Sequence, residues 1–395
     1  MVMNRDYDYS VLASPQQARM CSEIMAQSFV ADAEEELQYL HSVGFENVRI
    51  LSQGTEVVGG LALLPMGQWF GGKRVTMTGV ASVAISPHIR GQGAATHLMS
   101  SVVQELASQG VALSTLYPAV QRLYQNVGYG IGGSRYTWRI DTEHIGIGKA
   151  SLSYYPQALK EVAPYWRALQ NSRGQFHQGT LDRHPLLWQR LLKSPGEGTS
   201  FAYTIGNVEN PAGYLIAYQH RETDGAILTI RDWAALSQLA MESIWGLVHQ
   251  QRSQVDAVQW AGGAVDPLAL ALPEQRARVT DASHWMVRIL DLKQALEHRG
   301  YPLGVNGELH LEVSDPLVAK NHGRFLLEVN QGEGRLTPGG RGELALSIQN
   351  LAPLYAGMRS AQELYALGSL EAPPAVLPLA TAMFSGPRPW MPDFF

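Results

Sequence analysis

A glycine-rich loop is the clearest candidate for chemistry in this sequence. It lies in VAISPHIRGQGAATHLM, where strand-forming residues are followed by small residues and then by an amphipathic pattern. Backbone N–H groups at a helix start attract anions, and small residues let a phosphate approach them closely. The residues of this loop, which we call the cradle, are Arg90, Gly91, Gln92, Gly93, Ala94 and Ala95. The cradle predicts a phosphorylated ligand.

The spacing within the cradle argues against two common phosphate-binding motifs. A Walker loop needs Gly-Lys-Ser/Thr, which this loop lacks, and a dinucleotide fingerprint would have Gly or Ala where Thr96 stands. The pattern Arg-x-x-Gly-x-Ala, formed by Arg90, Gly93 and Ala95, resembles instead the pyrophosphate signature of the GNAT acyl-CoA N-acyltransferases. A glycine-rich helix start without a ligand is the alternative interpretation.

The resemblance extends along the whole chain. Residues 20–140 follow the GNAT pattern. The segments WMVRILDLKQAL, LHLEVSDP, GRFLLEV and LAPLYAGMRSAQELYALGSLE resemble the later domains of the Eis (enhanced intracellular survival) acetyltransferases. That family implies acetyl-CoA as cosubstrate, two fused GNAT-like domains, a sterol-carrier-protein-like C-terminal domain and a homo-oligomer, namely a hexamer.

The strand before the cradle is the expected contact for the rest of acetyl-CoA. In GNAT proteins this strand offers backbone groups to the pantetheine arm and the thioester carbonyl, which implies Val83, Ala84 and Ile85 here. Core packing is the alternative role for these side chains. Because the backbone does the binding, both roles are compatible.

The turn YQNVGYG, residues 124–130, contains the candidate general acid. By position, Tyr124 corresponds to the tyrosine that Eis-like enzymes use as general acid, within a Tyr-x-x-x-Gly-Tyr-Gly pattern. A phenol of reference pKa ~10 is protonated at neutral pH and can donate to a thiolate of reference pKa ~8.5. A tyrosine that only caps the turn is the alternative, and we expect Tyr129 to pack.

The end of the chain supplies the candidate general base. In the Eis family the C-terminal carboxylate of a terminal aromatic residue accepts the amine proton, and this sequence ends MPDFF, with Phe395 last. A carboxylate of reference pKa ~3.5 is a weak base, so we expect electrostatic help and a relayed proton. Asp393 would add negative charge to attract a cationic amine. A hydrophobic tail docked on the surface is the alternative.

Three further residues are candidates for the acceptor site. Asp32 and Glu36 belong to an acidic run in the N-terminal helical segment, which borders the acceptor in GNAT folds, although such a run is usually a solvated helix face. Trp69, near a glycine-rich turn, is a candidate pocket wall, with core or interface packing as the alternative.

The elements that hold these residues follow from hydrophobic periodicity. GVASVAISP predicts a buried strand, and an amphipathic helix ended by Gly110 follows it. VALSTLYP, AVQRLYQNV and GGSRYTWRI predict a strand, a short helix and a strand, which together give a mixed α/β layer. Residues 21–40 predict a helix and a second short helical turn.

Three domains are expected. Residues 1–145 would form the catalytic GNAT domain, and residues 146–288 a second GNAT-like domain of structural role. The second lacks an acetyl-CoA motif between AILTIRDWAA and SQLAMESIW. Residues 289–395 would form the sterol-carrier-protein-like domain, whose terminus reaches the active site.

Composition limits the partners. The formal net charge is −5 and the 30 Lys and Arg residues are scattered, which argues against nucleic acid. A single cysteine, Cys21, excludes an internal disulfide and paired-cysteine zinc sites, and we expect no metal. No apolar run reaches the ~18 residues of a membrane span, so the cytoplasm is the expected location. The low charged fraction, 16%, favours subunit contacts.

The sequence thus predicts an acetyl-CoA-dependent N-acetyltransferase. Its acceptor would be a primary amine of a polyamine or aminoglycoside-like small molecule, or a lysine side chain, attacking directly in a ternary complex. The alternative is a non-catalytic CoA- or lipid-binding protein that keeps the GNAT fold.

Overall fold

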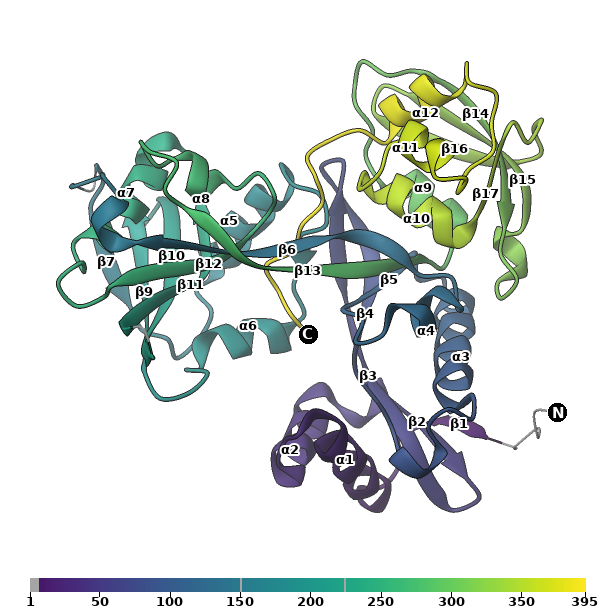
Figure 1. Ribbon diagram of the computed structural model, residues 1–395, viewed down its shortest axis with the longest axis horizontal. Helices are drawn as coiled ribbons and strands as arrows, with labels where there is room; N and C mark the ends of the chain where they lie inside the picture. The colour runs from purple at the N-terminus through teal and green to yellow at the C-terminus, as the bar shows by residue number, and fades with distance from the viewer. Residues whose placement is uncertain (1–6, 150, 224) are drawn as a thin grey trace. The chain divides into compact units, whose positions relative to one another are not determined.

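The computed structural model describes residues 7–149, 151–223 and 225–395, which form two compact units (Figure 1). The first unit holds the described residues up to Gly132, then Trp285–Gly386 and the last residue, Phe395. The second holds Gly133–His284 and Pro387–Phe394. Most of the expected first and third domains therefore shares one compact unit, whereas residues 133–145 and 387–394 belong to the other.

The first unit is built on an open sheet with strand order β1-β2-β3-β4-β5-β13. Its strands are β1 (Asp8–Val11), β2 (Val48–Gln53), β3 (Glu56–Phe70), β4 (Lys73–Ile85), β5 (Leu113–Leu116) and the end of β13 (Arg278–Ile289). β4 and β5 are parallel, whereas the other neighbours are antiparallel. The segment VRILSQGTEVVGGLALLPMGQWFGGKRV, with apolar runs between Gly-containing breaks, predicts a hairpin or meander of antiparallel strands, which β2 to β4 confirm. The strands predicted at GVASVAISP and VALSTLYP are confirmed as parts of β4 and β5.

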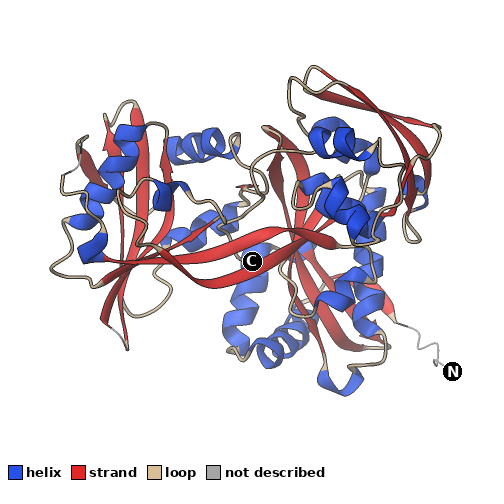
Figure 2. Cartoon of the chain, turned by 45° about the horizontal axis from the view of Figure 1, so that its top comes forward, coloured by secondary structure: helices blue, strands red, loops and turns tan. Residues whose placement is uncertain are grey.

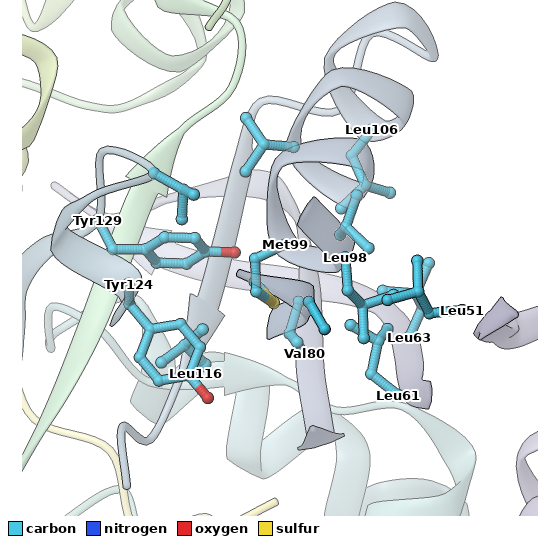
Figure 3. Packing of buried hydrophobic residues seen from close by; sticks show 14 of the residues in the cluster. Leu51, Leu61, Leu63, Val80, Leu98, Met99, Leu106, Leu116, Tyr124 and Tyr129 are labelled. Atoms are coloured by element: carbon cyan, nitrogen blue, oxygen red, sulfur yellow. The ribbon is translucent and has the colours of Figure 1, made fainter. Parts of the chain in front are cut away.

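Helices cover both faces of this sheet (Figure 1). They are α1 (Pro15–Phe29), α2 (Ala33–Val43), α3 (Ala94–Ser108) and α4 (Gln121–Gln125), with single turns η1 (Phe45–Asn47) and η2 (Pro87–Ile89). The buried face of α3 carries the residues that the periodicity predicts: Leu98, Met99, Val102, Val103 and Leu106. They pack with Leu51, Leu61 and Val80 into one core cluster (Figure 3).

The segment α2 differs from the expectation of a short helical turn. It is a helix of 11 residues, whose start is capped by the Asp32 carboxylate accepting from the backbone N–H groups of Glu34 and Glu35. Acidic side chains in the first turn also favour a helix because they complement its dipole. The apolar pattern alone predicted too short a helix, because it does not take account of the acidic run that stabilises the helix start.

The C-terminal part of the first unit contains a four-stranded sheet of order β16-β15-β14-β17 with helices over it (Figure 2). The strands are β14 (Gly307–Ser314), β15 (Gly323–Asn330), β16 (Glu333–Pro338) and β17 (Leu344–Ser347). The helices are α9 (Leu292–His298), η4 (Ala319–Asn321), α10 (Ile348–Ala356), α11 (Ala361–Ala366) and α12 (Leu377–Met383).

The second unit contains a sheet of order β6-β12-β11-β10-β9-β7. The strands of this sheet are β6 (Gly130–Asp141), β7 (Tyr154–Gln157), β9 (Thr199–Gly206), β10 (Pro211–Glu222), β11 (Gly225–Ala235) and β12 (Ala257–Gly262). The short strand β8 (Leu181–Asp182) lies outside this order. The helices of the second unit are η3 (Thr142–His144), α5 (Pro164–Gly174), α6 (Pro185–Leu192), α7 (Gln238–His249) and α8 (Pro267–Leu270). The parallel pair β11–β12, joined by α7, repeats the β4–α3–β5 arrangement.

The longest helices, α1 and α3, have 15 residues each. Within the described ranges, no helix is long and apolar enough to cross a membrane.

A buried arginine joins the parts of the first unit. Arg288, at the end of β13, pairs with Asp315 at 2.7 Å, and both side chains are fully buried. Its Nε also donates to the carbonyl of Val127, in the turn that follows α4. A Cβ on Gly128 would lie 2.7 Å from Arg288 Nε, and the glycine's φ of +88° favours the absence of a side chain. One guanidinium thus fixes both the YQNVGYG turn and the loop after β14.

We expect Asp315→Ala to lower the melting temperature sharply. Removing one partner leaves the Arg288 charge buried alone, a loss of about 3–5 kcal/mol. Glu333→Ala is the control, because it breaks the exposed Lys73–Glu333 pair and should leave the melting temperature unchanged. Equal melting temperatures for the two variants would contradict the role assigned to Arg288.

Candidate active site

The two central strands of the first sheet separate next to the cradle. β4 and β5 pair only from Met77 to Gly79, opposite Leu113 to Thr115. Beyond Gly79, β4 continues to Ile85 with β3 as its partner. The β5-facing side of Val80–Ile85 is therefore left for another occupant, and this stretch contains the predicted Val83, Ala84 and Ile85.

A bulge sharpens this separation. Gly60 pairs with Ala84 and Ala62 with Ala81, so Ser82 and Val83 on β4 face a single residue of β3. Ser82 has a φ of +53°, which is uncommon for a residue with a side chain. Bulges bend a strand and redirect its backbone groups, and they are frequent beside functional sites.

The cradle has the open geometry that an anion needs. Gly91 and Gly93 have φ values of +76° and +87°, and a Cβ on either would meet no atom within 4 Å. Gly93 precedes α3 without any side-chain cap, so the first N–H groups of the helix remain available.

Arg90 shapes the cradle from within. Its Nε donates to the Ile85 carbonyl at 2.9 Å, and its guanidinium donates to the Ser28 hydroxyl at 3.0 Å. Gln92 donates to the carbonyl of His88 at 3.0 Å. The side chain of Arg90 therefore ties the end of β4 to α1, while the residue itself remains exposed.

Tyr124 lies on α4, in the core cluster beside β5 (Figure 3). Its side chain is 5% exposed, and burial raises its pKa to about 12. The phenol is therefore neutral across the physiological pH range. Its ring meets that of Tyr129 edge to face, with centroids 6.0 Å apart.

The packing role expected for Tyr129 is confirmed. The residue is fully buried, and its hydroxyl shares a hydrogen bond of 2.7 Å with the Ser114 hydroxyl on β5. In Figure 3 the Tyr129 hydroxyl points into the cluster toward Met99, whereas the Tyr124 hydroxyl lies at the edge of the cluster. The two tyrosines of the turn thus differ in what surrounds their oxygen atoms.

The last residue, Phe395, lies in the first unit. Its ring meets Tyr117, which follows β5, edge to face with centroids 6.3 Å apart. A Cβ on Gly79 would lie 2.7 Å from its ring. The ring of Phe395 therefore lies where β4 and β5 separate. Its contacts with Gly79 and Tyr117 are not indicated by any motif in the sequence.

The acceptor-site candidates have more ordinary surroundings. Asp32 caps α2 with one carboxylate oxygen, and Glu36 is partly exposed on the same helix. Trp69 is buried on β3, and its indole N–H has no hydrogen-bond partner among the residues that the structure describes. The N–H of Glu36 donates to the Asp32 carbonyl at 3.0 Å, within the first turn of the helix. The role of these two residues and of Trp69 in an acceptor site remains a prediction.

The tail before Phe395 is held inside the second unit. The N–H of Trp390 donates to the Gln178 carbonyl at 2.9 Å, and Arg135 donates to the carbonyl of Pro392 at 3.1 Å. Trp390 is buried, whereas Phe394 is 64% exposed. The tryptophan of the apolar tail is thus docked within the second unit.

Asp393 has a partner that the sequence did not reveal. Arg183 Nε donates to its carboxylate at 2.7 Å, while the two terminal nitrogens of Arg183 hold Asp232 at 2.6 and 2.8 Å. The Tyr214 hydroxyl completes the group by donating to Asp232 at 2.6 Å. The charge of Asp393, expected to attract an amine, is therefore directed at a buried arginine.

Burial and pairing oppose each other in this group. Burial alone raises the pKa of Asp232, but the charge and hydrogen bonds of Arg183 outweigh burial and lower it. At Asp393 burial prevails, and the pKa of its carboxyl is raised despite Arg183. Asp232 is thus the firm counterion of Arg183, and Asp393 is the second.

Comparison with known proteins agrees with this architecture. Models of the acetyltransferase (GNAT) domain match residues 13–132 and 179–289, and a model of the sterol carrier protein domain matches residues 292–392. A solved GCN5-related N-acetyltransferase from Anabaena variabilis is 44% identical, covers 99% of this chain and all of its own, and has a TM-score of 0.96. The N-acetyltransferase Eis of Mycobacterium tuberculosis is 26% identical over 80% of each chain.

A second solved structure, a GCN5-related N-acetyltransferase from Kribbella flavida, is 26% identical with a TM-score of 0.86, covering 99% of this chain and 98% of that one. The chain therefore belongs to the GCN5-related N-acetyltransferases, a superfamily that uses acetyl-CoA. Within that superfamily it is Eis-like, with two GNAT domains followed by a sterol carrier protein domain. The predicted family and fold class are confirmed.

We expect Asp232→Asn to destabilise the second unit at neutral pH by about 3–5 kcal/mol, because Arg183 loses its main counterion inside the protein. The folded-state pKa of Asp232 is lowered, so its contribution exists above the carboxyl's ordinary pKa and is lost as the pH falls. The melting temperatures of variant and native protein should therefore converge in acid. Asp141→Asn, which removes a partly exposed pair with Arg278, should change the melting temperature little at any pH.

Proposed function

We propose that this chain transfers the acetyl group of acetyl-CoA to primary amines of a polyamine or aminoglycoside-like small molecule, or to lysine side chains. The observation that carries the proposal is the position of the chain end. The ring of Phe395 lies against Gly79 and Tyr117, beside the last residue pair that joins β4 to β5. This position of the ring supports the proposal that the terminal carboxylate acts beside the strand that GNAT proteins use for the thioester.

The residues of β4 and the cradle fit acetyl-CoA. Backbone groups of the stretch Val83, Ala84 and Ile85, which β5 does not cover, would hold the pantetheine arm, and the residues from Arg90 to Ala95, with the uncapped N–H groups at the start of α3, would hold the pyrophosphate. The bound thioester would supply an activated acetyl group. These residues would fix its position for attack by an amine held next to it.

Two groups of the first unit would handle the protons. The Phe395 carboxylate accepts the proton that the amine nitrogen loses as it bonds to the acetyl carbon, and passes that proton to solvent. The Tyr124 hydroxyl donates its proton to the sulfur as the carbon–sulfur bond breaks, and then recovers one from solvent. The products are an amide and CoA thiol, with no covalent acyl-enzyme.

The surroundings of Tyr124 support the acid role. Burial keeps the phenol protonated, with a pKa of about 12, so the proton is present throughout the physiological pH range. The same burial makes a lasting phenolate costly, which favours rapid reprotonation. The Tyr129 hydroxyl is already hydrogen-bonded to the Ser114 hydroxyl and is therefore less suited to donate a proton to the sulfur.

Asp32, Glu36 and Trp69 remain the proposed walls of the acceptor site. The two carboxylates would attract a cationic amine, and the indole would pack against its carbon skeleton. Because Arg183 pairs with Asp393, we assign most of the attraction from the tail to the terminal carboxylate. A hexameric assembly and a cytoplasmic location accompany the proposal as expectations from the family resemblance.

We expect Tyr124→Phe to lower kcat by about 10²- to 10⁴-fold, the usual contribution of a general acid. The KM for acetyl-CoA should change little, since the ring and its packing are kept. CoA release with a panel of amines measures both constants. Tyr129→Phe is the matched control and should leave kcat near the native value; a Tyr124→Phe enzyme with native kcat would remove Tyr124 from the mechanism.

We expect a short Gly-Ser extension after Phe395 to abolish most amine acetylation, because the carboxylate then lies several ångströms from its native position. Acetyl-CoA binding, measured by calorimetry, should persist. If the extended chain turns over as fast as the native one, the base assignment is wrong. If no amine gives turnover while acetyl-CoA binds to the native chain, the CoA-binding alternative holds.

A further inference from the structure

A missing side chain on β4 creates the space in which the chain ends. An ideal Cβ built on Gly79 would lie 2.7 Å from Cε2 and 3.2 Å from Cδ2 of Phe395. It would also lie 2.7 Å from Cε of Met66, on the neighbouring strand β3. Contacts below 3.0 Å cannot form without movement of the neighbours. Any side chain at this position would therefore displace the terminal ring or the methionine.

The backbone does not require glycine at this position. The φ of Gly79 is not positive, so its backbone conformation is one that any residue can adopt. It pairs regularly with Leu64 on β3 and with Thr115 on β5. Among the described surroundings, the close contacts with Phe395 and Met66 are what a side chain would disturb.

The position of Gly79 in the sheet adds to this argument. It is the last residue of β4 that pairs with β5, so the ring lies at the point where the two strands separate. Tyr117, just after β5, meets the ring of Phe395 edge to face. The space beside Gly79 that the ring occupies is thus bounded by β3, β4 and the end of β5, which all belong to the first unit.

We propose that Gly79, Met66 and Tyr117 form a seat for the terminal ring, and that Gly79 is the positioning residue that makes the carboxylate of Phe395 available for acetyl transfer. The expected effect of the seat on turnover depends on the proposed function. The position of the ring does not depend on it, because it follows from the contacts alone. Gly79 touches no reacting atom in this proposal and acts through Phe395.

The test is a double-mutant cycle between Gly79→Ala and Phe395→Ala. Gly79→Ala should lower kcat by about 10-fold to 100-fold, the range of an overpacked site, with the KM for acetyl-CoA unchanged. Phe395→Ala keeps the carboxylate but removes the ring, so in that background Gly79→Ala should have no further effect. Gly304→Ala is the control, because a Cβ there meets no atom within 4 Å.

A second readout separates the seat from the mechanism. Carboxypeptidase A removes a free terminal phenylalanine, and mass spectrometry follows the loss. Release should be faster in Gly79→Ala than in the native protein or in Gly304→Ala, by about the same 10-fold to 100-fold. This measurement does not depend on acetyl transfer.

The outcomes are distinct. If Gly79→Ala releases phenylalanine faster but retains the native kcat, the seat is supported and the carboxylate has no part in the mechanism. Native release in Gly79→Ala, or equal loss of kcat from Gly79→Ala with and without the terminal ring, would overturn the seat itself.

Discussion

The candidate site depends on one constraint: β4 and β5 remain hydrogen-bonded for three residue pairs and then separate. A parallel pair that continued would use both edges of β4 for the sheet and leave no backbone group for a ligand. Because the pairing with β5 ends at Gly79, the stretch from Val80 to Ile85 has β3 alone as its partner among the described strands, and the bulge at Ser82 turns this stretch further. The cradle follows the end of β4, the ring of Phe395 contacts Gly79, and α4, which carries Tyr124, follows β5.

The surrounding fold holds these parts in place by buried contacts. The apolar face of α3 anchors the helix whose start forms the cradle, and Arg288 fixes the turn after Tyr124 through the Val127 carbonyl. The same arginine binds Asp315 in the C-terminal part, so the sterol-carrier-like region supports the turn that carries the proposed acid. This gives that region a structural role that does not require a lipid.

The sequence predicted the elements well where periodicity is strong. The face of α3, the meander of β2 to β4 and the loop before α3 follow from hydrophobic spacing and glycine placement. The Arg183–Asp393 pair and the contact between Gly79 and Phe395 could not be predicted, because each joins residues more than 200 positions apart. A glycine in a strand indicates close approach of another group, but the sequence alone does not say which group approaches.

The second unit shows what the cradle requires beyond the fold. It repeats the strand, helix and parallel strand, since β11, α7 and β12 follow the order of β4, α3 and β5. Yet only residues 236–237 join β11 to α7, compared with residues 86–93 in the first unit. Ser237 also caps α7 by accepting from the N–H of Ala240, whereas Gly93 leaves α3 uncapped. A helix start whose N–H group is taken by its own cap, with no loop to surround a phosphate, is a poor anion site. The two copies of the fold therefore differ here by six loop residues and one cap, whereas the order of strand, helix and parallel strand is the same in both.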